Sequence, residues 1–170
     1  MLDFYTAINK STKTKVILDD RYIRKFKHHF YTISIHTSGK NPNEDVITKI
    51  AAVKYHNRKG KTEFYEKVEE ANEEEVIRRF VEFIKDALNG KYGIYVTGYT
   101  FDIDFIVGAL KKYGYDYNII YVNYTSFSRK YLVYVDSFKS FVSNQKENFE
   151  DNLLGTCNAN AEALLEMMGN

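Results

Sequence analysis

Few side chains in this sequence have the types and spacing that chemistry requires. Asp102 lies close to the start of a predicted helix, and Asp136 comes at the end of a predicted strand. Carboxylate oxygens hold hard cations such as Mg²⁺, whereas the nitrogen ligand His36 would suit zinc or nickel better. Asp102 and His36 alone are too few for a tight metal site. A rebuilt site would need further carboxylates, from Asp136, Asp19 or Asp20.

The single cysteine, Cys157, lies near the start of a predicted C-terminal helix. It has no adjacent base in the sequence, and a thiol nucleophile needs one, so the residue is interpreted as a packing residue. One cysteine excludes an internal disulfide and a multi-cysteine zinc site, and it is compatible with a reducing compartment. We therefore expect the protein to be cytoplasmic.

A basic segment near the N-terminus offers charge for the phosphates of a nucleic acid. Residues 1–29 are polar and basic, and this texture separates them as an extension from the rest of the chain. The same pattern is typical of a solvated arm. The candidate phosphate-binding residues of the extension are Arg21, Arg24, Lys25 and Lys27.

Hydrophobic patterns predict the elements that position these side chains. Alternating residues over 30–36 predict a strand, and a nearly apolar run makes 47–55 a central strand. A hairpin turn at 57–60 leads into a third strand at 62–68. Three antiparallel strands are therefore expected to open the domain.

Helical and strand patterns alternate in the rest of the chain. Asn72 and Glu75 resemble a capping box at the start of a helix that Gly90 ends. The further predicted elements are a strand at 92–97, a helix from about 100 to 114, a strand at 131–135 and a helix at 158–168. This order predicts an α/β fold with a mixed β-sheet of about five strands flanked by helices.

Length and composition indicate one globular domain with a substantial core. The chain has 170 residues, of which 44% are hydrophobic and 28% charged. At this size roughly 70% of the unfolded surface can be buried on folding. The net charge is +1, so binding to nucleic acid has to be local. No run approaches the roughly 18 apolar residues of a membrane span, and we expect no membrane partner.

Three segments carry a resemblance to a known family. Residues 31–39 are hydrophobic and end in Thr37-Ser38-Gly39, residues 96–102 end in Phe-Asp, and residues 160–165 read Asn-Ala-Glu-Ala-Leu-Leu. In this order they resemble the three motifs of the DnaQ-like 3′-5′ exonucleases, the DEDDh group of the ribonuclease H-like fold. Val135-Asp136-Ser137 resembles the Asp-Thr that follows that family's fifth strand. The resemblance implies that residues 30–170 form an exonuclease-like domain.

The same resemblance implies a catalytic centre that this chain has lost. In the family, four carboxylates of the motifs hold two divalent metals and a histidine activates water. Mg²⁺ needs several anionic oxygens in an octahedron, which one carboxylate, a hydroxyl, an amide and an imidazole do not supply. Only the aspartate of the second motif is kept. The matching positions in this sequence are Ser34, His36, Asp102, Asn160 and Gly155.

The loop after the first motif keeps part of the family pattern. Thr37, Ser38 and Gly39 have the small side chains with which the family's loop backs a terminal nucleotide, so they are candidate nucleic-acid-binding residues. Small polar residues are equally typical of any tight turn between two strands.

These observations predict a degenerate 3′-5′ exonuclease-fold protein that does not cleave and acts as a nucleic-acid-binding or regulatory module. Its expected partner is single-stranded nucleic acid or another protein, and no cofactor is expected. One alternative is an active metal-dependent 3′-5′ exonuclease with a rearranged site, which would use Mg²⁺ or Mn²⁺. Another is a protein-protein interaction subunit of a replication, repair or viral complex.

Overall fold

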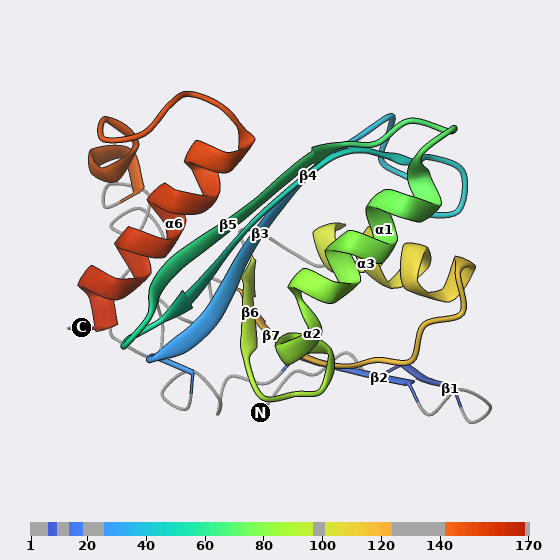
Figure 1. Cartoon of the computed structure of the whole chain (residues 1–170), viewed down its shortest axis with the longest axis horizontal. Coiled ribbons are helices and arrows are strands. Elements are labelled where there is room, and N and C mark those ends of the chain that lie inside the picture. The colour runs from blue at the N-terminus through green and yellow to red at the C-terminus, as the bar shows by residue number, and fades with distance from the viewer. Residues whose placement is uncertain (1–6, 10–13, 19–25, 97–100, 124–141, 169–170) are drawn as a thin grey trace.

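A mixed β-sheet runs through the chain in a computed structural model that describes residues 7–9, 14–18, 26–96, 101–123 and 142–168. The described strands form one seven-stranded sheet in the order β1-β2-β7-β6-β3-β4-β5. Helices cover both faces of this sheet (Figure 1). The strands are β1 Ala7–Asn9, β2 Thr14–Leu18, β3 His29–Thr37, β4 Ile47–His56, β5 Gly60–Lys67, β6 Gly93–Val96 and β7 Asn118–Asn123.

The antiparallel strands β3, β4 and β5 confirm the predicted opening of the domain. β4 pairs with β3 on one side and with β5 on the other. Its apolar run Ile50–Val53 is completely buried, because packing covers both faces of a central strand. The β4–β5 hairpin turns at Gly60, whose φ of 79° favours glycine.

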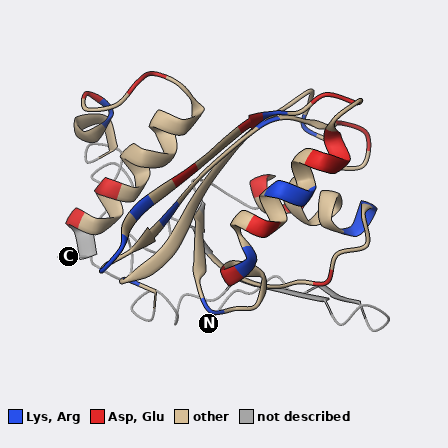
Figure 2. Ribbon diagram, in the orientation of Figure 1, with Lys and Arg blue, Asp and Glu red and all other residues tan. Residues whose placement is uncertain are grey.

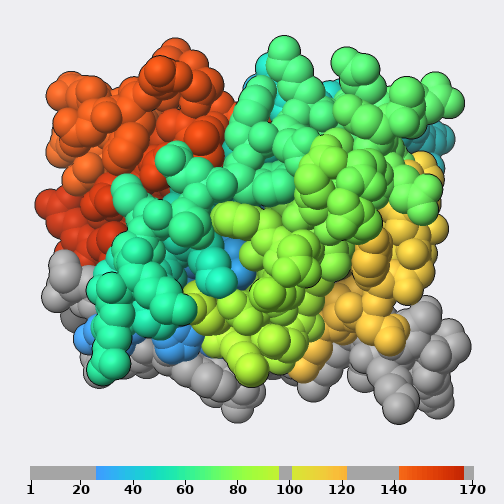
Figure 3. Space-filling view, viewed as in Figure 1, coloured from blue at the N-terminus to red at the C-terminus, as the bar shows by residue number. Residues whose placement is uncertain are grey.

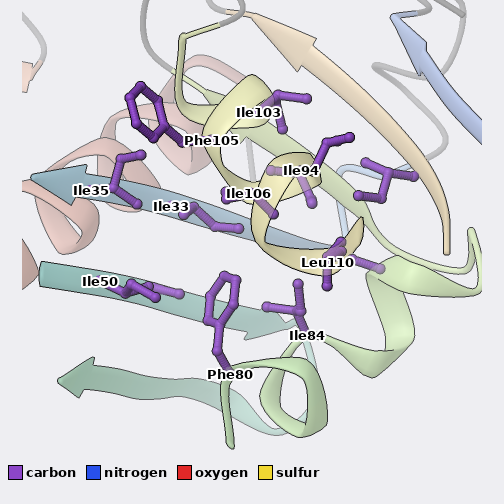
Figure 4. Packing of buried hydrophobic residues seen from close by; sticks show 14 of the residues in the cluster. Ile33, Ile35, Ile50, Phe80, Ile84, Ile94, Ile103, Phe105, Ile106 and Leu110 are labelled. Carbon is purple, nitrogen blue, oxygen red and sulfur yellow. The ribbon is translucent and has the colours of Figure 1, made fainter. Parts of the chain in front are cut away.

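Three helices cover one face of the sheet. They are α1 (Glu73–Phe83), α2 (Lys85–Leu88) and α3 (Phe101–Lys112). Their apolar side chains pack against the odd-numbered residues Ile33 and Ile35 of β3 and against Ile50 of β4 (Figure 4). β3 continues into this core with Tyr31, whose hydroxyl donates to the Phe83 carbonyl at 2.7 Å.

The helix α6 (Leu153–Met168) covers the opposite face. Cys157, Ala161 and Leu164 are buried there in a cluster that includes Phe30 of β3. The Thr32 hydroxyl donates to the Cys157 carbonyl at 2.8 Å. Side chains alternate along a strand, so the even-numbered residues of β3, Ser34 among them, are on the α6 face.

The first predicted helix differs from the structure in two respects. It does not continue to Gly90, because α1 ends at Phe83 and α2 follows as a separate short helix. The predicted capping box is also wrong. The side chain of Asn72 accepts a hydrogen bond from the Glu69 amide at 2.7 Å, and Glu75 pairs with Arg78 instead.

The C-terminal helix begins earlier than the sequence predicts, at Leu153 instead of residue 158. The Asn152 side chain accepts a hydrogen bond from the Gly155 amide at 2.7 Å. An asparagine side chain that bonds a free amide of the first turn is a typical N-cap. Because of this cap the helix begins at Leu153, before the hydrophobic stripe from which the start at residue 158 was predicted.

β7 is a strand that the sequence analysis did not predict. Its residues Asn118–Asn123 contain Ile119, Ile120 and Tyr121, a β-branched and aromatic run that suits a strand. β7 pairs in parallel with β6 and with β2, so the described part of the N-terminal extension belongs to the same sheet. The strand predicted at 131–135 lies outside the described residues.

Candidate functional site

Ser34 lies in the middle of β3 and faces α6. It is 7% exposed and is in register with Ala51 of β4. The Ser34 hydroxyl lies near the Cys157 sulfur and lowers the pKa of the thiol, against the larger effect of burial, which raises it. The thiol also approaches the Ala51 carbonyl at 3.4 Å. The position that resembles the family's first metal-binding aspartate is therefore a buried hydroxyl close to a thiol.

Asp102 lies in the first turn of α3 and is half-buried. Its charge raises the pKa of the Cys157 thiol, which places the carboxylate in the same neighbourhood as Cys157 and Ser34. Burial raises the pKa of Asp102 itself to about 7. A carboxyl at a helix N-terminus would normally be stabilised in its charged form. Here the cost of desolvating the carboxylate exceeds the stabilisation by the helix N-terminus, so the carboxyl readily takes up a proton near neutral pH.

Asn160 lies on α6, three residues after Cys157, and is 4% exposed. Residues three apart lie on neighbouring positions of a helix surface, so Asn160 follows Cys157 along the face that covers the sheet. Ser34 and Cys157 thus lie near each other between β3 and α6, with Asn160 one turn along, and Asp102 of α3 is near enough to Cys157 for its charge to raise the pKa of the thiol.

The other two positions do not restore the family pattern. Gly155 is buried, and a Cβ at this residue would lie 1.8 Å from the Glu150 carbonyl oxygen. The backbone of the preceding loop therefore occupies the space that a histidine side chain would need. His36 is exposed and lies at an irregularity in the β3–β4 pairing, where its register partner is Lys49.

A pair of divalent metals does not fit these residues. Ser34 and Asn160 carry no charge, and the lone carboxylate of Asp102 is desolvated so that its neutral form is favoured. Within the part of the chain that the structure describes, no group of three or more His, Cys, Asp or Glu side chains could hold a metal ion. The carboxylates proposed as substitutes, Asp19, Asp20 and Asp136, lie outside the described residues.

Cys157 has a central place that the sequence analysis did not foresee. It is completely buried, which fits the predicted packing role, and its backbone and side chain both bond to the sheet. Burial raises the pKa of its thiol to about 12. The thiolate is the nucleophilic form, so a thiol at this position does not act as a nucleophile at neutral pH.

The loop that follows β3 is closed by its own hydrogen bonds. The Asp45 carboxylate accepts from the Ser38 hydroxyl at 3.3 Å and from the Asn41 amide at 2.9 Å. The Thr37 hydroxyl donates to the Gly39 carbonyl at 2.5 Å. These polar groups stabilise the turn, and the carboxylate adds a negative charge beside it.

Of the basic residues assigned to the N-terminal extension, Lys27 is described and is half-buried in the turn before β3. Arg21, Arg24 and Lys25 lie outside the described residues. No described helix has the length and apolar content that crossing a membrane requires.

Two hollows lie on the described surface. One of about 280 Å³ lies between the β3–β4 loop, α1 and α3, where Ile77, Phe105 and Lys112 are among its lining residues. The other, of about 150 Å³, borders Gly155 and Asn158 at the start of α6. Ser34, Asp102 and Asn160 line neither of these two hollows.

Comparison with known proteins places the fold. No protein-family model matches the sequence, and no curated protein matches it significantly. Among solved structures, the zinc-bound complex of Escherichia coli exonuclease I with single-stranded DNA superposes with a TM-score of 0.52 at 15% identity. The match covers 82% of this chain and 39% of that chain. The architecture is thus the ribonuclease H-like fold seen in exonuclease I, as the sequence predicted.

Two further structures of exonuclease I resemble the chain less well. The apo form gives a TM-score of 0.45 at 14% identity, over 82% of this chain and 40% of that chain. The E. coli enzyme in complex with a dA13 oligonucleotide gives 0.43 at 14% identity, over 82% of this chain and 39% of that chain. The chain therefore spans about two fifths of the length of these exonuclease I structures.

Proposed function

We propose that this domain is a nucleic-acid-binding or regulatory module of the exonuclease fold that does not cleave phosphodiester bonds with divalent metals. One observation carries the proposal. At the four positions where the family has carboxylates, the chain has a buried hydroxyl close to a thiol, an exposed imidazole, one desolvated carboxyl and a buried amide. This group has too little negative charge for a pair of Mg²⁺ ions.

The fold supports nucleic acid as the partner. Exonuclease I is one structural neighbour, and one of its structures is a complex with single-stranded DNA. At these positions the chain brings at most one carboxylate, that of Asp102, against the phosphates of a bound strand. Binding without cleavage is the activity that this combination of fold and side chains favours.

The test is a nuclease assay on the purified chain with uniformly labelled single-stranded DNA and RNA. We expect no release of mononucleotides with Mg²⁺ or Mn²⁺, and retention of the oligonucleotide in a binding assay with EDTA present. The matched control is Asp102→Ala. Mononucleotide release that disappears both with EDTA and in this variant would establish an active exonuclease and refute the proposal.

A further inference from the structure

Three segments meet where β3 begins, at the opposite end of the strand from Ser34 and His36. They are the turn at 26–29, the β4–β5 turn at 56–60 and the loop at 89–92 before β6. His29 is in register with His56, and Phe30 is in register with Gly93. The Asn57 amide donates to the His28 carbonyl at 2.9 Å. In Figure 3 the β4–β5 turn (teal), the start of β3 (blue) and the loop before β6 (yellow-green) adjoin on one surface.

This end of the sheet concentrates positive charge in a chain whose net charge is only +1. Residues 26–31, 54–61 and 89–95 contain no aspartate or glutamate. Figure 2 shows basic residues at the β4–β5 turn and before β6. We call this surface the basic end; its cationic residues are Lys27, Lys54, Arg58, Lys59, Lys61 and Lys91.

Acidic residues pair with two of these cations, and three others are exposed to solvent. Asp86 pairs with Lys54 at 2.7 Å, and Glu162 pairs with Lys61 at 2.5 Å. The side chains of Arg58, Lys59 and Lys91 are exposed. These three cations flank the paired lysines, so the surface attracts anions.

Aromatic rings lie among these cations. The ring of Tyr92 is 5.0 Å from the His29 ring and 6.4 Å from the His56 ring, centroid to centroid. The Lys54 ammonium is 5.1 Å from the centre of the Tyr92 ring. All three rings are half-buried, so each is held in place by packing and still reaches the surface.

A close backbone contact fixes this arrangement. Phe26 is completely buried, and its ring lies so close to Gly93 that a Cβ there would be 2.4 Å from a ring carbon. The His29 amide donates to the Phe26 carbonyl at 3.2 Å, which closes the turn. The turn and its histidines are thereby held against the start of β6.

We propose that the basic end is a second binding surface, and that its ligand is single-stranded nucleic acid. Arg58, Lys59 and Lys91 contact phosphates, and bases stack on the rings of His56 and Tyr92. Exposed cations interleaved with aromatic rings suit a single strand, because every base has a face that stacks and every linkage has a charge. A duplex does not present its base faces in this way.

The surface is separate from the candidate site described above. The seven steps from His29 to His36 extend about 23 Å along β3, at about 3.3 Å per residue. Binding at the basic end therefore does not depend on Ser34 or Asp102. The proposal of a second binding surface therefore holds whether or not the site near Asp102 cleaves nucleic acid.

The first experiment measures the affinity of the full chain for a fluorescein-labelled dT20 oligonucleotide between 25 and 200 mM NaCl, with EDTA present. We expect Arg58→Gln/Lys59→Gln to weaken binding about tenfold at low salt and to reduce the slope of log K against log salt by about 1.4, at about 0.7 for each of two phosphate contacts. The control Lys111→Gln/Lys112→Gln removes an equal adjacent charge at the end of α3 and should leave both quantities unchanged. Equal effects of the two double variants, or no effect of either, would overturn the proposal.

The second experiment separates base stacking from simple attraction of polyanions. His56→Leu and Tyr92→Leu should each weaken dT20 binding about tenfold, while inorganic polyphosphate should bind both variants as it binds the wild type. His56 lies at the edge of a turn, so His56→Leu tests base stacking even if Tyr92→Leu disturbs the packing. Unchanged dT20 binding by folded His56→Leu protein, or tighter competition by duplex than by single strand, would rule out a single-strand surface. Neither result bears on metal-dependent cleavage, the outcome that would refute the function proposed above.

Discussion

Replacement of Asp102 by asparagine should stabilise the protein above neutral pH. The buried carboxyl has a pKa of about 7, against an ordinary value of 3.8. Between these two values the folded state holds a proton that the unfolded state has released. The free energy of unfolding therefore falls as pH rises through this window, and the full penalty is present above pH 7. Asparagine has nearly the same shape and carries no charge, so Asp102→Asn removes the penalty.

The size of the effect follows from the shift in pKa. A change of about three pKa units, at about 1.36 kcal/mol each, corresponds to about 4 kcal/mol. Asp102 is only half-buried, and loss of its charge at the helix N-terminus costs about 0.5 kcal/mol, so about 2 to 3 kcal/mol is expected at pH 8. The difference should shrink to less than about 1 kcal/mol at pH 4.5.

Urea unfolding of both proteins at pH 4.5, 6, 7 and 8 measures this difference. Asp116→Asn is the matched control, because it removes an exposed carboxylate and should change stability by less than about 0.5 kcal/mol at every pH. A variant that is less stable than wild type at pH 8, or a difference that does not vary with pH, would refute the reasoning. Addition of Mg²⁺ at pH 8 should leave the wild type unchanged; selective stabilisation of the wild type would identify Asp102 as a metal ligand.

Two further predictions test the candidate site and the packing of the sheet. Ser34→Asp/His36→Glu/Asn160→Asp should be less stable than wild type without metal, because crowded carboxylates repel one another, and Mn²⁺ at a hundredfold excess over its Kd should restore about 2.7 kcal/mol in a melting scan. A folded triple variant without a metal-dependent shift would show that these positions do not surround Asp102. Gly93→Ala should destabilise the protein by about 1 to 3 kcal/mol in urea unfolding, because the new methyl group would overlap an aromatic ring. Gly108→Ala, where nothing lies within 4 Å of the new Cβ, should instead stabilise α3 by about 0.5 to 1 kcal/mol, and equal effects at the two glycines would contradict the packing described.

Local patterns determined much of the sheet. The strands β3, β4 and β5 follow from alternation, an apolar run and a glycine turn, each of which acts over a few residues. The same alternation placed Ser34 and His36 on one face of β3, and the sequence alone showed that these positions lack carboxylates. The start of α3 near Asp102 was likewise readable from its own residues.

Other elements depended on partners far away in the chain. β2 and β7 pair in parallel between residues more than a hundred positions apart, such as Val16 and Ile119. A short strand gains most of its stability from such pairing, so its own sequence predicts it poorly. The early start of α6 depends instead on a local hydrogen bond, the Asn152 cap, which hydrophobic periodicity does not contain.

The sequence by itself determined the chemistry that is available: one carboxylate among the motif positions, one cysteine, and basic residues without acids in three short segments. The tertiary structure alone decided which of these meet. It buried Cys157 against Ser34 beside Asp102, and it filled the space at Gly155 with the Glu150 backbone. It also joined the three basic segments at one end of the sheet, because strand register aligns residues that the chain separates widely.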